Sequence, residues 1–427
     1  MIRAVMGEAC LTTPPGPTAV GTSASHDVHS RWETWAWRGW ILLAIGIAAR
    51  IALFERDPGR NNVYLTVFAV AADAFRQGGD LYLEPDGWAS GFRYLPLSAA
   101  MLVPFSLCGA VLGSVLWRLL AFGMLAAALR LATRLGFPFP LSSRQRAFVL
   151  IVVGALGIGS LNNGQSNPHI LACFLLATLG SLRGHAAGPA AAVAGSVALK
   201  VYPVAYGGVL GALRLRHAAW LAVFVAAVFA LPFALQDPAY VARQYTDLWN
   251  VLRGEDRTGG SLIHAYRDLR LVAVSFGLTM PDPLFLVLGA LSGGAIVVAC
   301  LLLRRAGGSE VRVHEYAFSL TMCWFLLLGP ATEKSTYTLL GPPLAWTWLA
   351  AKRSQSRGLR ALVVLAMVLA FLGLTSLDRP RDERPVWVWC FLPYSALAAS
   401  AALVWRITGD FRALRAKLTG QPQADRK

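Results

Sequence analysis

Acidic residues are missing from long stretches of this sequence. Between Asp86 and Asp237 there is no Asp or Glu, although the same stretch contains ten Lys and Arg residues. A second acid-free stretch begins after Glu333. A carboxylate that takes part in proton transfer must therefore come from residues 55–94, from residues 237–282 or from Glu333, apart from a few acids in basic or terminal segments.

Charged residues of both signs are also scarce, and the familiar motifs of soluble enzymes are absent. Only 15% of the 427 residues are charged, 56% are hydrophobic, and the mean hydropathy is +0.52. A single water-facing globule cannot bury that much apolar surface, which excludes soluble enzymes and DNA-binding domains. No C-x-x-C or H-E-x-x-H motif, Walker loop, G-x-G-x-x-G loop or G-x-S-x-G elbow occurs in a usable context. No ligand cluster requires a metal, although the sequence allows a mobile divalent metal as a cofactor.

Apolar runs long enough to cross roughly 30 Å of hydrocarbon predict an all-α, polytopic membrane fold. We count about twelve such runs, near residues 37–54, 95–111, 113–131, 146–161, 168–182, 188–213, 217–235, 283–303, 314–330, 336–351, 358–376 and 386–406. An even number of crossings places both termini on one side of the membrane. The chain then divides into a disordered tail (1–34), a transmembrane domain (35–406) and a basic tail (407–427). The late start of the first apolar run argues against a cleaved signal peptide.

Basic clusters set the predicted orientation. The net charge of +16 comes mostly from Lys and Arg between the apolar runs, which is expected of cytoplasmic loops rather than of a surface that binds nucleic acid. Both tails are then cytoplasmic. Four arginines contradict this count, because it places them on the opposite face: Arg130, Arg134, Arg144 and Arg146. If the run 188–213 were broken at Lys200 into two short helices, these arginines would lie on the cytoplasmic face. That arrangement also requires one crossing fewer or more near residues 95–131.

Residues 63–76 are too short and too amphipathic to span the membrane, and they predict a helix that lies in the interface. Such a helix either frames a lateral opening for a lipid or packs on the end of the bundle, and its periodicity does not decide between the two. The flanking segments 55–94 and 236–282, together with the short turn 331–335, share one predicted extracytoplasmic face. Nucleotide cofactors are absent from that face, which favours a lipid-linked or exported substrate.

The polar segment Pro330–Tyr337 lies between two strongly apolar helices and contains the leading catalytic candidate. Glu333 is a candidate base or a ligand for an acceptor hydroxyl, and Lys334 is a candidate phosphate contact, because ionisable groups at such depth are costly to keep. The alternative is an ordinary loop with a local ion pair. A turn this short needs no charged pair, which favours a functional role.

Two further cations and one polar turn lie in apolar surroundings. Lys200 either binds a lipid phosphate or extends its ammonium to the interface. Arg93, which has an aromatic residue on each side, suits a phosphate that it would bind with two hydrogen bonds. The turn Leu161–Pro168 contains four amide side chains and a serine, which either bind a sugar or form a tight polar turn. The spacing alone favours the turn.

Six short motifs give the chain a family resemblance. They are Gly79-Asp-Leu-Tyr82, Phe92-Arg-Tyr-Leu-Pro96, Val103-Pro-Phe-Ser106, Gly164-Gln-Ser-Asn167, Lys200-Val-Tyr-Pro203 and Ala331-Thr-Glu-Lys-Ser-Thr-Tyr337. In this order and spacing, the chain resembles the family 87 glycosyltransferases, which are polytopic enzymes of the GT-C superfamily. The resemblance covers roughly residues 40–350.

The resemblance implies an activity, partners and a set of site residues. Enzymes of this kind take a sugar, commonly mannose, from a polyprenyl-phosphate donor and place it with inversion on a lipid or glycan acceptor. The implied location is the extracytoplasmic face of a bacterial plasma membrane, in contact with membrane lipids and without nucleic acid. Arg93, Lys200 and Lys334 would contact the donor phosphate. Residues expected to contact the sugar or the acceptor are Asn61, Asn62, Tyr64, Tyr94, Gln165, Asn167, Tyr202 and, from the second outer loop, His264.

The chain departs from the family pattern at the expected base. The resemblance implies an Asp just before the interfacial helix, but with Phe68 in the aromatic position of that pattern, the Asp position is occupied by Tyr64. An Asn61-Asn62 pair stands slightly upstream, as in a similar subgroup. Asp57, Asp73 or Glu333 then takes the role of the base, or the activity is lost.

Two alternatives to a glycosyltransferase stay open at this point. A multi-helix lipid or solute transporter, including a flippase, would also have polar residues within its membrane domain. Inverted repeats are expected in that case, and the two halves of the sequence show no convincing similarity. The second alternative is a catalytically inactive relative that has lost the usual Asp.

Overall fold

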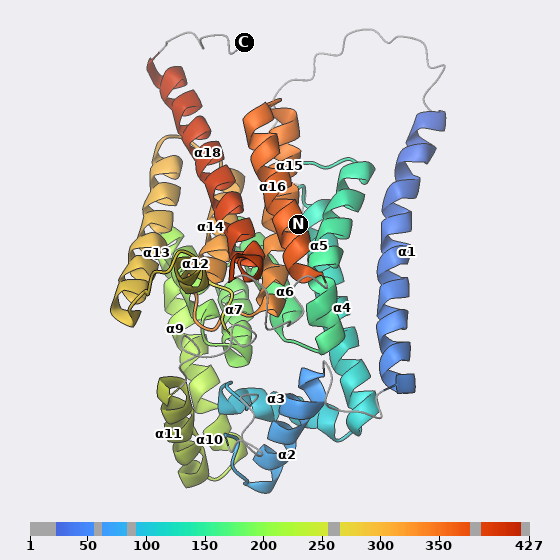
Figure 1. The fold of residues 1–427 in the computed structure, drawn as a ribbon, viewed down its shortest axis with the longest axis vertical. Coiled ribbons are helices and arrows are strands. Elements are labelled where there is room, and N and C mark those ends of the chain that lie inside the picture. Colours follow the sequence, from blue (N-terminus) through green and yellow to red (C-terminus); the bar gives the residue numbers. More distant parts are fainter. Residues whose placement is uncertain (1–22, 55–61, 83–90, 255–264, 376–385, 420–427) are drawn as a thin grey trace, which may run out of the picture.

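The computed structural model describes residues 23–54, 62–82, 91–254, 265–375 and 386–419, and every regular element in these ranges is a helix. In chain order (Figure 1) the elements are α1 (Ser23–Phe54), the π-helix η1 (Tyr64–Ala69), α2 (Val70–Gln77), α3 (Pro96–Ser106), α4 (Ala110–Arg134), α5 (Ser143–Asn163), α6 (Asn167–Leu182), α7 (Ala187–Leu199), α8 (Pro203–Leu213), α9 (Leu215–Ala230), α10 (Pro232–Leu235), α11 (Pro238–Gly254), α12 (Leu269–Ser275), α13 (Asp282–Arg305), α14 (Glu310–Leu328), the 3₁₀-helix η2 (Lys334–Leu340), α15 (Gly341–Arg353), α16 (Arg357–Leu374), α17 (Val386–Trp389) and α18 (Phe391–Thr419).

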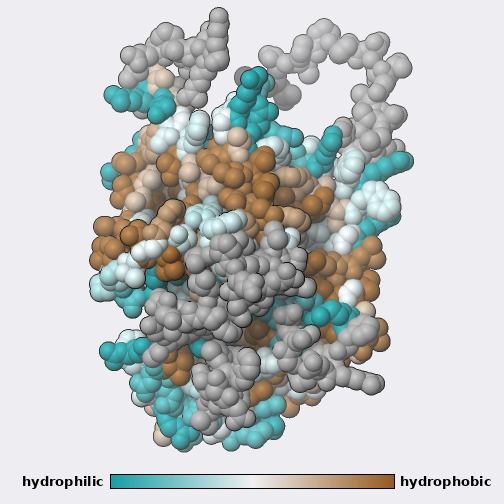
Figure 2. Space-filling model, in the orientation of Figure 1, coloured by the Kyte–Doolittle hydropathy of each residue, from teal (hydrophilic) through white to brown (hydrophobic). Residues whose placement is uncertain are grey.

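The helices form a bundle with a hydrophobic belt. Six helical stretches of the described residues are long and apolar enough to cross a membrane: Arg31–Leu53, Ala110–Arg134, Ser143–Asn163, Leu215–Leu235, Asp282–Arg305 and Arg357–Leu374. Figure 2 shows hydrophobic surface around the middle of the molecule and hydrophilic residues toward both ends. The chain is therefore an all-α, polytopic membrane protein. The count of about twelve crossings and the division into two tails and one domain stay predictions.

One end of the bundle collects basic helix termini, and we call it the basic end. Arg146 at the start of α5 forms an ion pair of 2.7 Å with Glu33 in α1, and Arg134 at the end of α4 lines the same hollow. Arg353 at the end of α15 donates to the carbonyl of Pro140 at 2.7 Å. The loops 135–142 and 354–356 thus lie at this end, together with the start of α1.

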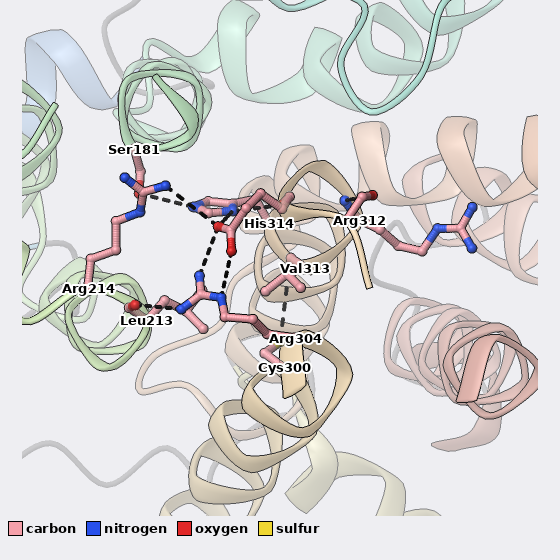
Figure 3. Close-up of polar contacts among 10 residues, drawn as sticks. Ser181, Leu213, Arg214, Cys300, Arg304, Arg312, Val313 and His314 are labelled. Atoms are coloured by element: carbon pink, nitrogen blue, oxygen red, sulfur yellow. Dashed lines mark hydrogen bonds and ion pairs between the residues drawn. The ribbon is translucent and has the colours of Figure 1, made fainter. Parts of the chain in front are cut away.

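A second group of contacts at the basic end joins α6, α13 and α14 (Figure 3). The Glu310 carboxylate accepts from Arg304 at 2.9 Å and lies 3.6 Å from the guanidinium of Arg214. The ring of His314 is fully buried, and its Nε2 lies 3.0 Å from the Ser181 hydroxyl. A cavity at this end is lined by both the 136–140 loop and the start of α14.

Two of the predicted spans differ from the observed helices, and the difference corrects the predicted placement of the four arginines. The predicted span at 95–111 is the 11-residue helix α3, which is about 16 Å long and too short to cross. The predicted span at 188–213 is two helices, because Lys200 has an extended backbone (φ −156°, ψ 144°) and Pro203 begins α8. Together these changes bring Arg130, Arg134, Arg144 and Arg146 to the basic end. The count that placed them on the opposite face was wrong.

The opposite end holds the described parts of the segments 55–94, 236–282 and 331–335, which were predicted to share a face, and we call it the site end. The Gln236 side chain donates to the carbonyl of Phe75 at 2.7 Å, and Arg267 N–H donates to the carbonyl of Thr332 at 2.7 Å. The predicted helix over 63–76 is confirmed as η1 and α2, which pack on α3 and α4 through buried faces. Its role as the frame of a lipid opening stays a prediction.

Candidate active site

A tight turn between α5 and α6 places three polar side chains in the bundle interior. Gly164 ends α5 with a left-handed backbone (φ 71°), a conformation that favours glycine. Pro168 lies in the first turn of α6. The side chains of Gln165, Ser166 and Asn167 are 6%, 0% and 0% exposed. The predicted turn is confirmed, and it is aimed inward.

The Glu333 segment meets this turn directly. The Nε2 of Gln165 donates to Oε2 of Glu333 at 3.5 Å, and Nδ2 of Asn167 donates to the Ser335 hydroxyl at 3.1 Å. The Glu333 backbone is held by Thr336, whose hydroxyl accepts from Glu333 N–H at 3.3 Å and whose N–H donates to the Glu333 carbonyl at 3.0 Å. These backbone contacts fix the start of η2 and direct the half-buried carboxylate to the α5–α6 turn.

Two more segments bring a cation and a phenol to the same carboxylate. Lys200, at the break between α7 and α8, is an electrostatic neighbour of Glu333. The Tyr94 hydroxyl, just before α3, also lies in the field of Glu333 and beside Ser166. Tyr202, from the same break as Lys200, lies close to Tyr94. Four chain segments thus converge on Glu333, and we call these residues with Gln165, Ser166 and Asn167 the Glu333 cluster.

Several buried polar atoms of this region have no hydrogen-bond partner within the described ranges. They are Oε1 of Gln165, Oγ of Ser166, Oδ1 of Asn167, the Tyr202 hydroxyl and both ring nitrogens of His169. An unsatisfied buried polar group costs about 1–3 kcal/mol, so such a concentration needs an explanation. A ligand rich in hydroxyl groups supplies both donors and acceptors to these atoms.

Other predicted site residues lie outside this cluster. Asp73 on α2 is half-exposed and lies 4.0 Å from Arg76 of the next turn. Tyr64 is fully buried, and its electrostatic neighbours are Cys108, Asp73 and Arg118, so its hydroxyl faces the corner between α3 and α4. Arg93 and Lys334 are half-buried beside Tyr94 and Glu333 in the chain. Asp57, Asn61 and His264 lie outside the described residues.

Asn62 belongs to a second polar group that is organised by Arg118, a residue that the sequence analysis missed. Arg118 on α4 is 2% exposed and donates to Oδ1 of Asn62 at 3.0 Å and to the Asn162 carbonyl at 3.0 and 3.2 Å. It also donates to the carbonyl and the hydroxyl of Ser114. A Cβ on Gly164 would lie 3.0–3.2 Å from the guanidinium, so the arginine packs on the α5–α6 turn. An arginine inside a 25-residue apolar helix was the available signal.

A buried acid, Asp268, also lies near the Glu333 segment. It begins α12 by accepting from Arg270 N–H at 2.9 Å, and its carboxylate lies 3.8 Å from the Arg270 guanidinium. Burial raises the pKa of Asp268, and Arg270 opposes this effect. The neighbouring Arg267 carbonyl accepts from the Tyr337 hydroxyl at 2.8 Å, which ties this segment to η2. The contacts of Asp268 are those of a helix cap rather than of a catalytic base.

The described residues do not supply a metal site. Within them, no group of three or more His, Cys, Asp and Glu side chains is arranged to hold an ion. The Glu333 cluster combines one carboxylate with an ammonium, amides and hydroxyls. This set suits proton transfer, an anionic group and sugar hydroxyls better than it suits a divalent cation.

Comparison with known families gives one match. The family model for glycosyltransferase family 87 matches residues 92–330, more than half of the chain. The matched range includes Arg93, the α5–α6 turn and Lys200, and it ends shortly before Glu333. No curated protein matches the chain.

Proposed function

The chain belongs to glycosyltransferase family 87. We propose that it transfers a sugar, with mannose as the proposed sugar, from a polyprenyl-phosphate donor to a lipid or glycan acceptor. The observation that carries this proposal is the convergence on Glu333 of Lys200, Tyr94 and the α5–α6 turn. The proposed site thereby combines a proton acceptor, a cation for a phosphate and polar atoms for a sugar.

The proposed reaction is a single displacement with inversion. The carboxylate of Glu333 accepts the proton of the acceptor hydroxyl while that oxygen attacks the anomeric carbon of the sugar. The bond between the anomeric carbon and the phosphate oxygen breaks, and polyprenyl phosphate leaves. The ammonium of Lys200 stabilises the charge that develops on the leaving phosphate, with Arg93 and Lys334 as further phosphate contacts.

The unsatisfied polar atoms are the proposed sugar contacts. Oε1 of Gln165, Oδ1 of Asn167 and the Tyr202 hydroxyl are buried, have no partner in the part of the chain that the structure describes, and can bond with sugar hydroxyls. The hydroxyl of Tyr94 has both Glu333 and Ser166 as neighbours and suits the acceptor or the sugar. Asn62 and Tyr64, which have their contacts at the α3–α4 side, are proposed to shape the wall of the site rather than to reach the reacting atoms.

The proposed orientation places the site end outside the cytoplasm of a bacterial cell. Lys and Arg concentrate at the basic end, and cytoplasmic loops carry such an excess. Nucleotide sugars are not available on the other side, which is why a lipid-linked donor fits the site end. Both tails then lie in the cytoplasm.

A transfer assay in proteoliposomes tests this function. The purified chain receives labelled polyprenyl-phosphate-mannose or labelled GDP-mannose, each with a lipid extract as the acceptor source. We expect labelled product from the polyprenyl donor alone. Product from GDP-mannose alone would contradict the donor assignment, and movement of the donor across the bilayer without any transfer would identify a flippase.

A further inference from the structure

A large cavity lies at the basic end, away from the Glu333 cluster. Its volume is about 940 Å³, and it lies among α14, α15, α16, α18 and the loop between α4 and α5. Four arginines and two carboxylates line it, which gives a net charge of +2: Arg312, Arg353, Arg406, Arg412, Glu315 and Asp410. Nothing in the proposed transfer reaction uses these residues.

The two carboxylates already have partners. Arg406 donates to Glu315 at 2.7 Å in a pair that is almost fully buried. Arg312 donates to one oxygen of Asp410 at 2.8 Å, and the Tyr316 hydroxyl donates to the other at 2.7 Å. The excess positive charge therefore belongs to Arg353 and Arg412, neither of which has a carboxylate partner within the described residues.

Two helix N-termini add to the positive potential of the cavity. Ser309 begins the 19-residue helix α14 and Ser356 begins the 18-residue helix α16, and both serines line the cavity. The N-terminus of a helix carries a partial positive charge, which favours a phosphate. Ser354 and Thr408 also line this space, and their hydroxyls, which donate to backbone carbonyls, can accept from a glycerol hydroxyl of a headgroup.

The cavity also adjoins a surface suited to acyl chains. Val404 and Trp405 of α18 line it and are 53% and 51% exposed, and the Trp405 ring packs close to Gly358 of α16. A tryptophan in this position is typical of the boundary between hydrocarbon and headgroups. Farther along α16, Val364 and Phe371 are exposed on the hydrophobic belt. The cavity therefore joins a cationic recess to a lipid-facing surface.

We propose that this cavity binds the phosphate headgroup of an anionic phospholipid from the leaflet at the basic end. Arg353 and Arg412 contact the phosphate, the two helix N-termini add to its stabilisation, and the acyl chains lie along Val404 and Trp405. Basic recesses between transmembrane helices are the kind of site that holds anionic headgroups. This site is independent of the proposed donor, which binds at the other end of the bundle.

Native mass spectrometry of the full-length chain in detergent tests the proposal. The protein is titrated separately with dioleoyl-phosphatidylglycerol and dioleoyl-phosphatidylcholine, which share their acyl chains and differ in headgroup charge. We expect the anionic lipid to be retained roughly tenfold better, and its retention to weaken as salt screens the contact. Equal retention of both lipids, or no dependence on salt, would overturn the proposal without the use of any variant.

Arginine variants assign the site. The double variant Arg353→Gln/Arg412→Gln should retain phosphatidylglycerol roughly tenfold less well. Arg183→Gln/Arg305→Gln is the matched control, because both of its residues are exposed at the basic end and line none of the described cavities. Equal losses in the two double variants would mean nonspecific attraction. Glycerol 1-phosphate is the competitor: if it displaces the lipid at equal concentration, the site is one for a soluble phosphate and the lipid assignment is wrong.

Discussion

The side chains of Gln165 and Glu333 meet at 3.5 Å although 168 residues separate them in the sequence. Asn167 and Ser335, separated by the same number of residues, meet at 3.1 Å. Two parallel contacts of this kind fix η2 against the α5–α6 turn. They hold Glu333 where Lys200 and Tyr94 also converge, so the position of the carboxylate depends on four chain segments at once.

Replacement of Lys200 by Met should weaken donor binding at least tenfold and change the melting temperature little. The methionine keeps most of the length and the apolar character of the stem but removes the charge that is proposed to face the phosphate. Binding of polyprenyl-phosphate-mannose is measured by calorimetry in detergent. Lys352→Met, at the basic end, is the control and should bind normally. Unchanged affinity in Lys200→Met would show that the lysine only extends to the interface.

Replacement of Gly164 by Ala should destabilise the protein by about 1–3 kcal/mol. The backbone there is left-handed, and the new Cβ would lie 3.0–3.2 Å from the Arg118 guanidinium. Thermal unfolding in detergent measures the change. Gly159→Ala is the matched control, because Gly159 lies inside α5 and a Cβ there meets nothing within 4 Å. An equal melting temperature for both variants would contradict the packing of Arg118 on the turn.

The Asp268→Asn variant should gain stability relative to the wild type as the pH rises. Burial raises the pKa of the acid above its value of 3.8 in the unfolded chain, so the native state holds the proton more tightly. The stability that this proton contributes is complete below the unfolded pKa and is lost as the pH rises through the folded pKa. Asparagine keeps the cap on α12 and does not titrate. The melting temperature of Asp268→Asn minus that of the wild type should therefore increase with pH. A decrease of this difference toward high pH would contradict the prediction.

Cysteine labelling in intact cells tests the orientation. Gln77→Cys lies at the exposed end of α2 and Ser354→Cys lies exposed at the basic end, and both are made with Cys10 and Cys108 replaced by Ala. An impermeant thiol reagent should label position 77 in intact cells and position 354 only after lysis. The reverse pattern would place the site end in the cytoplasm and remove the reason for a lipid-linked donor.

Hydropathy predicted the helical fold but not the path of the chain through residues 95–213. A window that averages over about twenty residues counts α3 as a crossing and joins α7 to α8, since both regions are apolar throughout. The signals that decide the path are local. Pro96 and Gly109 limit α3, and Pro203 begins α8 after the extended Lys200. With these breaks, Arg130, Arg134, Arg144 and Arg146 lie at the basic end, where the excess of Lys and Arg in cytoplasmic loops predicts them.

The candidate site was predictable in its parts but not in its assembly. Glu333, Lys200 and Gln165 were each recognised as polar groups in apolar surroundings, and Tyr94 was named as a sugar or acceptor contact; the structure places these residues near one another. Their spacing in the sequence contains no information on that contact. Arg118 was missed because the partners that tie it to other segments, Asn162 and Asn62, lie 44 and 56 residues away.

Turnover of the Glu333→Gln variant tests the central claim most directly. Glutamine keeps the shape of the side chain and its place beside Gln165 but cannot accept the proton of the acceptor. Transfer from labelled polyprenyl-phosphate-mannose should fall by roughly two to four orders of magnitude while donor binding survives. Asp73→Asn, which changes a half-exposed acid outside the cluster, should transfer normally. Wild-type turnover in Glu333→Gln, or its loss in Asp73→Asn alone, would contradict the assignment of Glu333 as the base.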